Sequence, residues 1–357
     1  MSPTPQQPGN KAFQVTAIGD RFVPADVFQE VFERFPDISL QAVDIDEEAT
    51  PEGELGIREY RGDPQKVIEL AQEADAVLIH VAPITRHVIE SLPNLKLIGT
   101  ARGGPVNVDV AAATERGIPV VTAPGRNAEA VAELTVALAV MLLRHIPRAA
   151  EAGRTAVDLG QSVVEGADFM GHELAGTEIG LVGFGRVGHR VASLLSAFGA
   201  HVMVHDPFVE AEVIKAAGCE PVALDELVRR ARVVSLHARA TAENENLINA
   251  ERLSSMRRDA VLINTARETL VDENALIDAL KEGRIAAAAL DVVRPAPVRS
   301  AHPLSTLPNC LLLPHVGGAT REAAVRGVEL LADAIRAFLD GQQLPNVINP
   351  EAIEKGG

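Results

Sequence analysis

The feature that most constrains the fold is a glycine-rich segment between a predicted strand and a predicted helix. Gly183, Gly185 and Gly188 form the pattern G-x-G-x-x-G directly after the apolar run 178–182, and a helical run, 187–198, follows. In this context the glycines permit a tight turn, a close approach of the backbone to a pyrophosphate, and close packing of helix on strand. The segment therefore predicts a dinucleotide-binding β-α-β unit whose helix N-terminus attracts phosphate charge.

The acidic residue that such a unit uses follows the next predicted strand, 201–205. Asp206 lies 18 residues beyond the last glycine. This is close to the spacing of about 20 expected for the group that accepts hydrogen bonds from the adenosine ribose. A carboxylate at this point repels a 2′-phosphate, and Pro207 follows it with no adjacent arginine. We therefore expect NAD rather than NADP.

Short runs rich in Val and Ile recur along the chain with helical stretches between them, a pattern typical of parallel sheets. The first series of predicted strands covers 13–18, 39–45, 76–81, 95–101 and 119–122. The second series covers 178–182, 201–205, 233–237, 261–264, 286–290 and 310–313. Between the two series we predict one long helix over 127–150, and after the second series a helix over 321–339. A chain of 357 residues has room for two such domains.

Composition narrows the class of protein. The chain holds 33 basic and 49 acidic residues, a net charge of -16, which disfavours nucleic acid and anionic membranes as partners. The longest apolar stretch, 134–143, is too short to span a bilayer, and residues 1–10 lack the features of a signal peptide. Only Cys219 and Cys310 are present, so we expect no disulfide framework, no cysteine-built zinc site and no metal, and we expect a reducing cytoplasm.

Several further motifs carry a resemblance to a known family. The blocks 180–206, 263–273, 290–292 and 314–320 occur in the order and spacing seen in D-isomer-specific 2-hydroxyacid dehydrogenases. The segments 107–109, 115–120 and 127–134 resemble the same family, so the likeness runs from about residue 13 to residue 347.

The resemblance implies an α/β fold with two doubly wound parallel sheets. A Rossmann NAD-binding domain, residues 127–317, is expected to be inserted into a flavodoxin-like substrate domain built from residues 1–126 and 318–357. The resemblance also implies that the active site lies between the domains and that the crossover helix forms a homodimer.

The chemistry that the resemblance implies is hydride transfer between nicotinamide and C2 of a small polar D-2-hydroxy acid. Arg267 matches the arginine that holds the substrate carboxylate, and His315 matches the acid–base histidine. Substrate binding is further expected at Arg102, Gly103 and Gly104. The residues expected to bind the cofactor are Gly183, Gly185, Arg186, Val187, Gly188, Asp206, His237, Thr265, Ala266, Asp291 and Gly317.

The chain departs from the family pattern at the acidic partner of the histidine. The family usually reads D-V-x-x-x-E-P, whereas this chain has Ala296 at the position of the acid. Because a neighbouring carboxylate stabilises a protonated imidazole, its loss favours the neutral ring, and we expect reduction of the keto acid to suffer more than oxidation of the hydroxy acid. Glu268, next to Arg267, either faces solvent or compensates by pairing with Arg267 or His315.

The substrate and the class of function stay open at this point. Phosphoglycerate dehydrogenases of the family often carry V-R-S where this chain has His80 and Val81 after Ile79, which argues against 3-phosphoglycerate unless Arg86 or Arg102 binds the phosphate. Arg102 either meets a second polar group of the substrate or points into solvent. Because the acid is missing, a second function stays open, that of a dinucleotide-sensing binding protein with the same fold. A formate dehydrogenase would be expected to carry an amide side chain at position 296, where this chain has Ala296.

Overall fold

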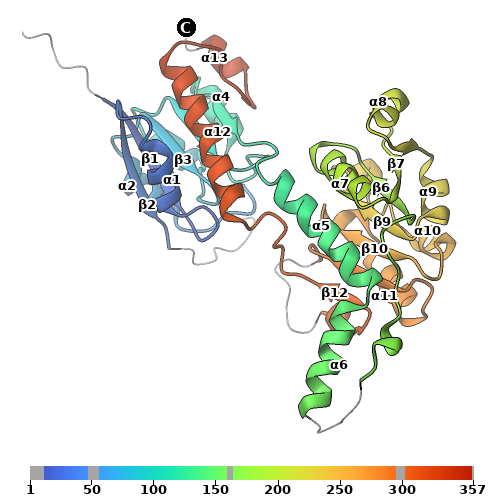
Figure 1. Cartoon of the computed structure of the whole chain (residues 1–357). Helices are drawn as coiled ribbons and strands as arrows, with labels where there is room; N and C mark the ends of the chain where they lie inside the picture. Colours follow the sequence, from blue (N-terminus) through green and yellow to red (C-terminus); the bar gives the residue numbers. More distant parts are fainter. Residues whose placement is uncertain (1–11, 47–55, 159–163, 295–301, 356–357) are drawn as a thin grey trace, which may run out of the picture. The chain divides into compact units, whose positions relative to one another are not determined.

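The computed structural model describes residues 12–46, 56–158, 164–294 and 302–355, which form two compact units (Figure 1). Unit 1 consists of Met1–Asn127 and Ala319–Gly357, and unit 2 of Ala128–Gly318. Both are α/β units with all-parallel sheets, which confirms the predicted fold class. Every predicted strand occurs, with ends that differ by at most two residues, and one short strand, β8, was not predicted.

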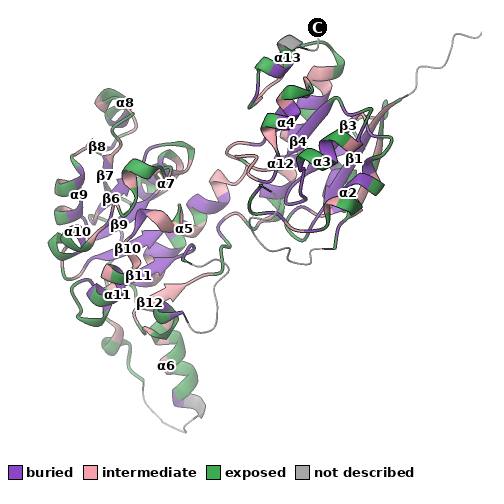
Figure 2. Ribbon diagram, turned by 180° about the vertical axis from the view of Figure 1, so that it is seen from behind, coloured by how far each residue is buried: buried purple, intermediate pink, exposed green. Residues whose placement is uncertain are grey.

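Unit 1 contains a five-stranded sheet in the order β2-β1-β3-β4-β5. Helices α1 and α12 pack on one face of the sheet and α2, α3 and α4 on the other, so β3, β4 and β5 are buried on both sides, whereas the edge strand β2 is only partly buried (Figure 2). Its strands are β1 (Phe13–Gly19), β2 (Ile38–Asp44), β3 (Ala76–Ile79), β4 (Leu97–Thr100) and β5 (Val120–Thr122). Its helices are α1 (Ala25–Phe32), α2 (Pro64–Ala71), α3 (Arg86–Ser91), α4 (Val110–Glu115), α12 (Arg321–Leu339) and α13 (Glu351–Lys355).

Unit 2 contains a seven-stranded sheet in the order β12-β11-β10-β9-β6-β7-β8. Helices α5, α7 and α8 cover one face and α9, α10 and α11 the other. Its strands are β6 (Glu178–Val182), β7 (His201–His205), β8 (Glu220–Pro221), β9 (Val233–Leu236), β10 (Val261–Asn264), β11 (Ala287–Leu290) and β12 (Cys310–Leu312). Its α-helices are α5 (Ala128–Leu143), α6 (Ile146–Asp158), α7 (Arg186–Ala197), α8 (Ala211–Ala216), α9 (Leu224–Arg230), α10 (Ala250–Ser255) and α11 (Glu273–Lys281).

The prediction of one long helix over 127–150 is wrong. The segment forms two helices, α5 and α6, that meet at 60° around His145, whose φ is 52°. Pro147 explains the break, because a proline has no N–H and its ring clashes with the carbonyl of the residue four positions earlier. That carbonyl belongs to Leu143, which accepts a hydrogen bond from the N–H of His172 at 2.9 Å instead.

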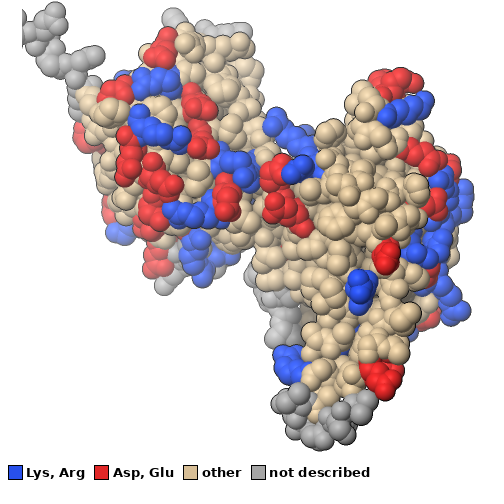
Figure 3. All heavy atoms as spheres, viewed as in Figure 1, with Lys and Arg blue, Asp and Glu red and all other residues tan. Residues whose placement is uncertain are grey.

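Acidic and basic side chains are interspersed on the visible face of each unit (Figure 3). Several form ion pairs, such as Arg321 with Glu30 in unit 1 and Arg230 with Glu178 in unit 2. No single helix among the described residues is long and apolar enough to cross a membrane, although the bent pair α5 and α6 meets these criteria when the two are taken together.

Candidate active site

The predicted cofactor loop of unit 2 follows β6 and leaves no room for side chains at two of its glycines. Gly183 has a φ of 100°, and a Cβ atom there would lie 2.5 Å from the backbone nitrogen of Ala238. A Cβ atom on Gly188 would lie 2.2 Å from the carbonyl oxygen of Gly183. Strand β6, helix α7 and the segment after β9 therefore approach so closely at this point that only glycine fits.

Gly185 differs from the other two glycines because its Cβ position faces open space, with no atom within 4 Å. Gly185 is the N-cap of α7, and no side chain caps that helix end. Arg186 and Val187 form its first turn, exposed and half-buried respectively. Uncapped N–H groups beside an open space suit a phosphate group, so this loop fits the pyrophosphate of a dinucleotide.

Asp206 lies at the end of β7, beside this loop. Its Oδ2 accepts a hydrogen bond from the N–H of Phe184 at 2.7 Å, and its Oδ1 accepts one from the N–H of Phe208 at 2.9 Å. Each carboxylate oxygen can accept a further bond, so the half-buried group retains capacity for ribose hydroxyls.

Three more predicted cofactor residues follow β9 and β10. The ring of His237 lies 2.9 Å from the hydroxyl of Ser235 through Nε2, and burial lowers the pKa of His237 to about 4, so the ring is neutral at pH 7. Thr265 and Thr135 share a hydrogen bond of 3.1 Å between their hydroxyls, which ties the end of β10 to α5. Ala266 donates its N–H to Asn264 Oδ1 at 3.1 Å.

Arg267 lies on the turn that follows β10, and its side chain is exposed. Asn264, the last residue of the strand, accepts from Ala266 and donates its Nδ2 to the carbonyl of Arg267 at 2.8 Å, so the turn is fixed from both sides. The guanidinium donates to the Ala266 carbonyl at 2.8 Å and forms no ion pair with the described carboxylates. Its other donors are therefore available to a substrate carboxylate.

His315 lies on the turn after β12, exposed and with a φ of 58°. The buried carboxylate of Asp291, which follows β11, accepts from Val316 N–H at 2.7 Å and from Gly317 N–H at 2.8 Å. A Cβ atom on Gly317 would lie 2.8 Å from Asp291 Oδ2. The sequence predicts that Asp291 and Gly317 bind the cofactor, and in the structure they also hold the turn that carries His315.

Ala296, the position of the missing acid, lies outside the described residues. Glu268 is half-buried and, within the described segments, forms no ion pair with either Arg267 or His315. Its predicted compensating role therefore has no support in this arrangement. No cluster of His, Cys, Asp and Glu side chains suited to a metal occurs in the described part of the chain.

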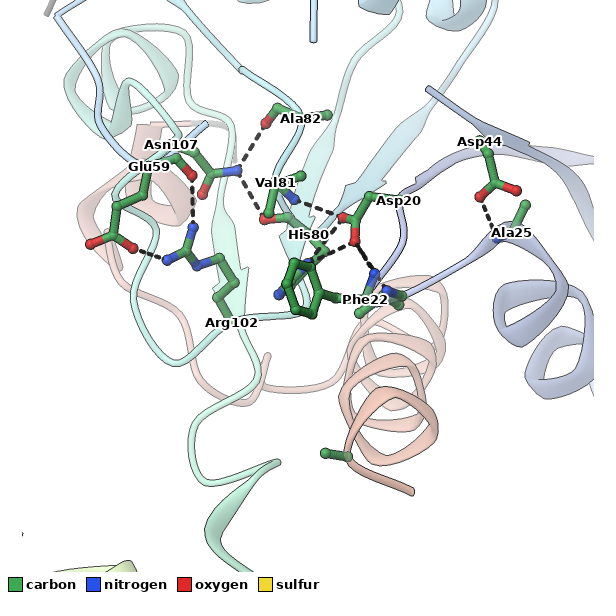
Figure 4. Close-up of polar contacts among 12 residues, drawn as sticks. Asp20, Phe22, Ala25, Asp44, Glu59, His80, Val81, Ala82, Arg102 and Asn107 are labelled. Carbon is green, nitrogen blue, oxygen red and sulfur yellow. Dashed lines mark hydrogen bonds and ion pairs between the residues drawn. The ribbon is translucent and has the colours of Figure 1, made fainter. Parts of the chain in front are cut away.

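The predicted substrate loop, at 101–104, belongs to unit 1 and follows β4. Arg102 donates to the carbonyl of Glu59 at 3.0 Å and also pairs with the carboxylate of Glu59 (Figure 4). Gly103 is exposed and Gly104 half-buried, and a Cβ atom on Gly104 would meet nothing within 4 Å. Arg86 pairs with Glu115 at 2.6 Å. Both arginines considered for phosphate therefore have acidic partners already.

The sequence reasoning missed a buried polar group in unit 1. Asp20 and His80, which are 2% and 7% exposed, lie in contact after β1 and β3, and Arg126 binds His80 from the segment after β5. A signal was present, because polar residues that follow adjacent parallel strands meet at one edge of the sheet.

Comparison with known proteins identifies the family of this chain. Residues 136–317 match the family model described as D-isomer specific 2-hydroxyacid dehydrogenase, NAD binding domain. A protein named D-3-phosphoglycerate dehydrogenase from Methanocaldococcus jannaschii is 38% identical over 287 residues, 80% of this chain and 53% of that protein. The chain thus spans about half the length of the phosphoglycerate dehydrogenases that it matches. A protein named glyoxylate reductase from Aeropyrum pernix is 35% identical over 297 residues, 81% of this chain and 87% of that protein.

Solved structures give the same result at the level of the fold. The apo-structure of D-lactate dehydrogenase from Escherichia coli has a TM-score of 0.76 and 27% identity, covering 94% of this chain and 100% of that chain. The TT0316 protein from Thermus thermophilus has a TM-score of 0.77 and 31% identity over the same shares of the two chains.

Proposed function

Because the chain belongs to the D-isomer specific 2-hydroxyacid dehydrogenase family, with its NAD-binding domain at residues 136–317, we propose that it interconverts a small polar D-2-hydroxy acid and its 2-keto acid. One observation supports this proposal most strongly. The glycine loop, Asp206, Arg267 and His315 all follow strands of one parallel sheet, at its carboxyl edge. Ligands of open α/β sheets bind at that edge.

The cofactor that we propose is NAD. Gly183, Gly185 and Gly188 would hold its pyrophosphate at the N-terminus of α7, and Asp206 would accept hydrogen bonds from its ribose. His237, Thr265 and Ala266 lie after neighbouring strands of the same edge and would complete the site. Bound there, the nicotinamide would supply the hydride chemistry, as acceptor from C2 in oxidation of the hydroxy acid and as donor to C2 in reduction of the keto acid.

The protein groups that we propose for the reaction are Arg267 and His315. The guanidinium of Arg267 would hold the substrate carboxylate with paired hydrogen bonds. The imidazole of His315 would take the hydroxyl proton in oxidation and return it in reduction. Asp291 fixes the backbone on the C-terminal side of His315, which limits the orientations open to that ring. In unit 1, Arg102, Gly103 and Gly104 would bind the substrate.

The substrate that we propose is a small polar 2-hydroxy acid, with phosphorylated and sugar-derived acids among the candidates. The matched relatives are named for 3-phosphoglycerate and for glyoxylate, and one similar structure for lactate. These names leave 3-phosphoglycerate as one candidate among several.

Two further proposals concern assembly and location. Helix α5 has a side on which Leu134, Val140 and Met141 are only half-buried and Ala137 is exposed, and we propose that this side forms a homodimer. Light scattering of the purified chain tests this, because a monomer at every concentration contradicts it. The two free cysteines, Cys219 and Cys310, agree with a proposed cytoplasmic location.

The test is a panel of D- and L-2-hydroxy acids with NAD and NADP, followed by the absorbance of the reduced nicotinamide. We expect turnover of at least one D-acid with NAD. NADH binding without turnover of any acid, in either direction, would favour the dinucleotide-sensing alternative.

A further inference from the structure

The carboxyl edge of the sheet in unit 1 contains a buried polar group that the proposed reaction does not yet use. Strands β1 and β3 are neighbours in the order β2-β1-β3-β4-β5, so the chain leaves these two strands in opposite directions. Such a switch point is where open α/β sheets form a ligand crevice. Asp20 follows β1 directly, and His80 follows β3 directly.

Asp20 is a buried carboxylate held by several donors. Its oxygens lie 3.0 and 3.2 Å from Nδ1 of His80, and they accept backbone bonds from Phe22, Val23 and Val81 (Figure 4). Burial opposes ionisation of the group, but the bonds from His80 and the backbone outweigh it, and the pKa of Asp20 is lowered. Asp20 is therefore negatively charged at neutral pH.

His80 connects this carboxylate to an arginine. Its Nε2 lies 2.9 Å from Nη2 of Arg126. Because a guanidinium can only donate, Nε2 is the acceptor, and the ring proton on Nδ1 is donated to Asp20. Burial lowers the pKa of His80 and, together with the charges of Arg126 and Arg102, outweighs the hydrogen bond and charge of Asp20, which raise it. The ring is therefore neutral and is fixed between a carboxylate and a guanidinium.

Arg126 is a half-buried cation that no described carboxylate pairs with. Besides His80 it binds the carbonyl of Ala323 at 3.2 Å. Burial and then the charge of Arg102 lower the pKa of Arg126 to about 10, so it is still protonated at pH 7. Arg86 and Arg102 differ from it in having acidic partners.

The fold makes room for the Arg126 side chain next to the substrate loop. A Cβ atom on Gly327, in α12, would lie 2.8 Å from Cδ of Arg126 and 3.5 Å from Cβ of Ala101, the first residue of that loop. A side chain at position 327 would therefore displace the arginine. The remaining N–H donors of Arg126 lie in a partly exposed position beside the predicted substrate loop.

We propose that Arg126 determines substrate specificity by binding a second anionic group of the substrate, a carboxylate or phosphate carried beyond C2. Asp20 and His80 are positioning residues that hold the guanidinium. A half-buried cation without a carboxylate partner gains from an anionic ligand, because the bond is charge-assisted and partly shielded from water. The inference rests on the proposed dehydrogenase function, and it narrows the substrate class to dianionic 2-hydroxy acids.

The experiment compares matched pairs of substrates that differ in the distal group. D-malate is paired with D-2-hydroxybutanoate, and D-3-phosphoglycerate with D-glycerate, so that carboxylate and phosphate are tested separately. We expect the wild type to prefer at least one dianionic member. We expect Arg126→Met to raise the KM for that dianionic substrate about 10- to 100-fold, with little change in kcat. The KM and kcat for the matched monoanionic substrate should change little.

Three further variants separate binding from structure. Arg126→Lys keeps the charge without the planar fork and should give an intermediate KM. Asp20→Asn should raise KM for the dianionic substrate by a smaller factor with kcat unchanged, which a general loss of folding would not do. Arg34→Met removes a cation of unit 1 that pairs with Glu329 and is 60% exposed, and it should leave both substrates unaffected.

The outcomes separate this inference from the proposed function. Preference for both monoanionic substrates, or an equal effect of Arg126→Met on both members of each pair, would overturn the inference and leave the dehydrogenase intact. Absence of turnover with every 2-hydroxy acid would contradict the proposed function instead. In that case calorimetric titration with inorganic phosphate and with malonate decides the inference, because binding must occur in the wild type and be lost in Arg126→Met.

Discussion

Two glycines of the cofactor loop allow a paired test. We expect alanine at position 188 to lower thermal stability and alanine at position 185 to weaken NADH binding. In Gly188→Ala the new Cβ would start 2.2 Å from the Gly183 carbonyl oxygen, whereas real Cβ contacts are essentially never under 3.0 Å. Helix α7 and the loop after β6 must therefore move apart by about 0.8 Å, since the clashing oxygen belongs to the backbone and not to a flexible side chain. In Gly185→Ala the Cβ meets only open space, and the backbone φ of -73° suits alanine.

The expected magnitudes follow from these distances. Overpacking of this kind costs about 1–3 kcal/mol, which for a unit of this size lowers Tm by roughly 3–10 °C in Gly188→Ala. Gly185→Ala should melt within about 2 °C of the wild type, because no protein contact changes. Its Kd for NADH should nevertheless rise about tenfold or more, since the methyl group takes the space that a pyrophosphate needs.

Thermal melting of the apo protein and fluorescence titration with NADH measure both properties on the same preparations. Unchanged NADH affinity in Gly185→Ala would refute the assignment of this loop to the pyrophosphate. An unchanged Tm in Gly188→Ala would refute the close packing of α7 on β6.

Three other perturbations test the residues proposed for catalysis and cofactor binding, and the pH dependence of the free energy of unfolding. Ala296→Glu should raise the rate of keto-acid reduction about tenfold or more, and the rate of oxidation less, whereas Ala296→Gln should not; equal rates in both variants would contradict a missing acid. Asp291→Ala leaves the N–H groups of Val316 and Gly317 without an acceptor and should lower kcat at least about tenfold, with loss of stability of about 1–3 kcal/mol measured by urea unfolding. Because folding lowers the pKa of His237 from 6.5 to about 4, the unfolded chain binds the proton first as the pH falls. The free energy of unfolding should therefore drop by up to about 3 kcal/mol between pH 6.5 and 4, and His237→Asn should lose that part of the pH dependence.

The sequence predicts the strands well because most are short apolar runs, and the central ones, such as β3, β4, β9 and β10, are buried on both faces. Such runs end where polar residues begin. The break between α5 and α6 could have been predicted, since Pro147 excludes a regular helix through the carbonyl of Leu143. The prediction of a single helix gave too little weight to a proline near the end of that segment.

Contacts between distant segments were much harder to predict. Glu59 pairs with Arg102 from a segment without regular secondary structure, and no periodicity indicates which arginine it meets. The group formed by Asp20, His80 and Arg126 depends on which strands are neighbours in the sheet, and that order is a property of the whole unit. Once the order is known, polar residues that follow adjacent strands become candidates for a site.

The central claim is that Arg267 and His315 carry out dehydrogenation of a D-2-hydroxy acid at an intact NAD site. The most direct measurement is kcat/KM for the best D-acid of the panel in Arg267→Met and His315→Gln, with the Kd for NADH determined on the same samples. Arg258→Met, which removes an exposed cation before β10, serves as the control. We predict that both site variants lose at least about 100-fold in kcat/KM while NADH binding and the control stay near wild type. Wild-type turnover in either site variant, or equal losses in the control, would contradict the account.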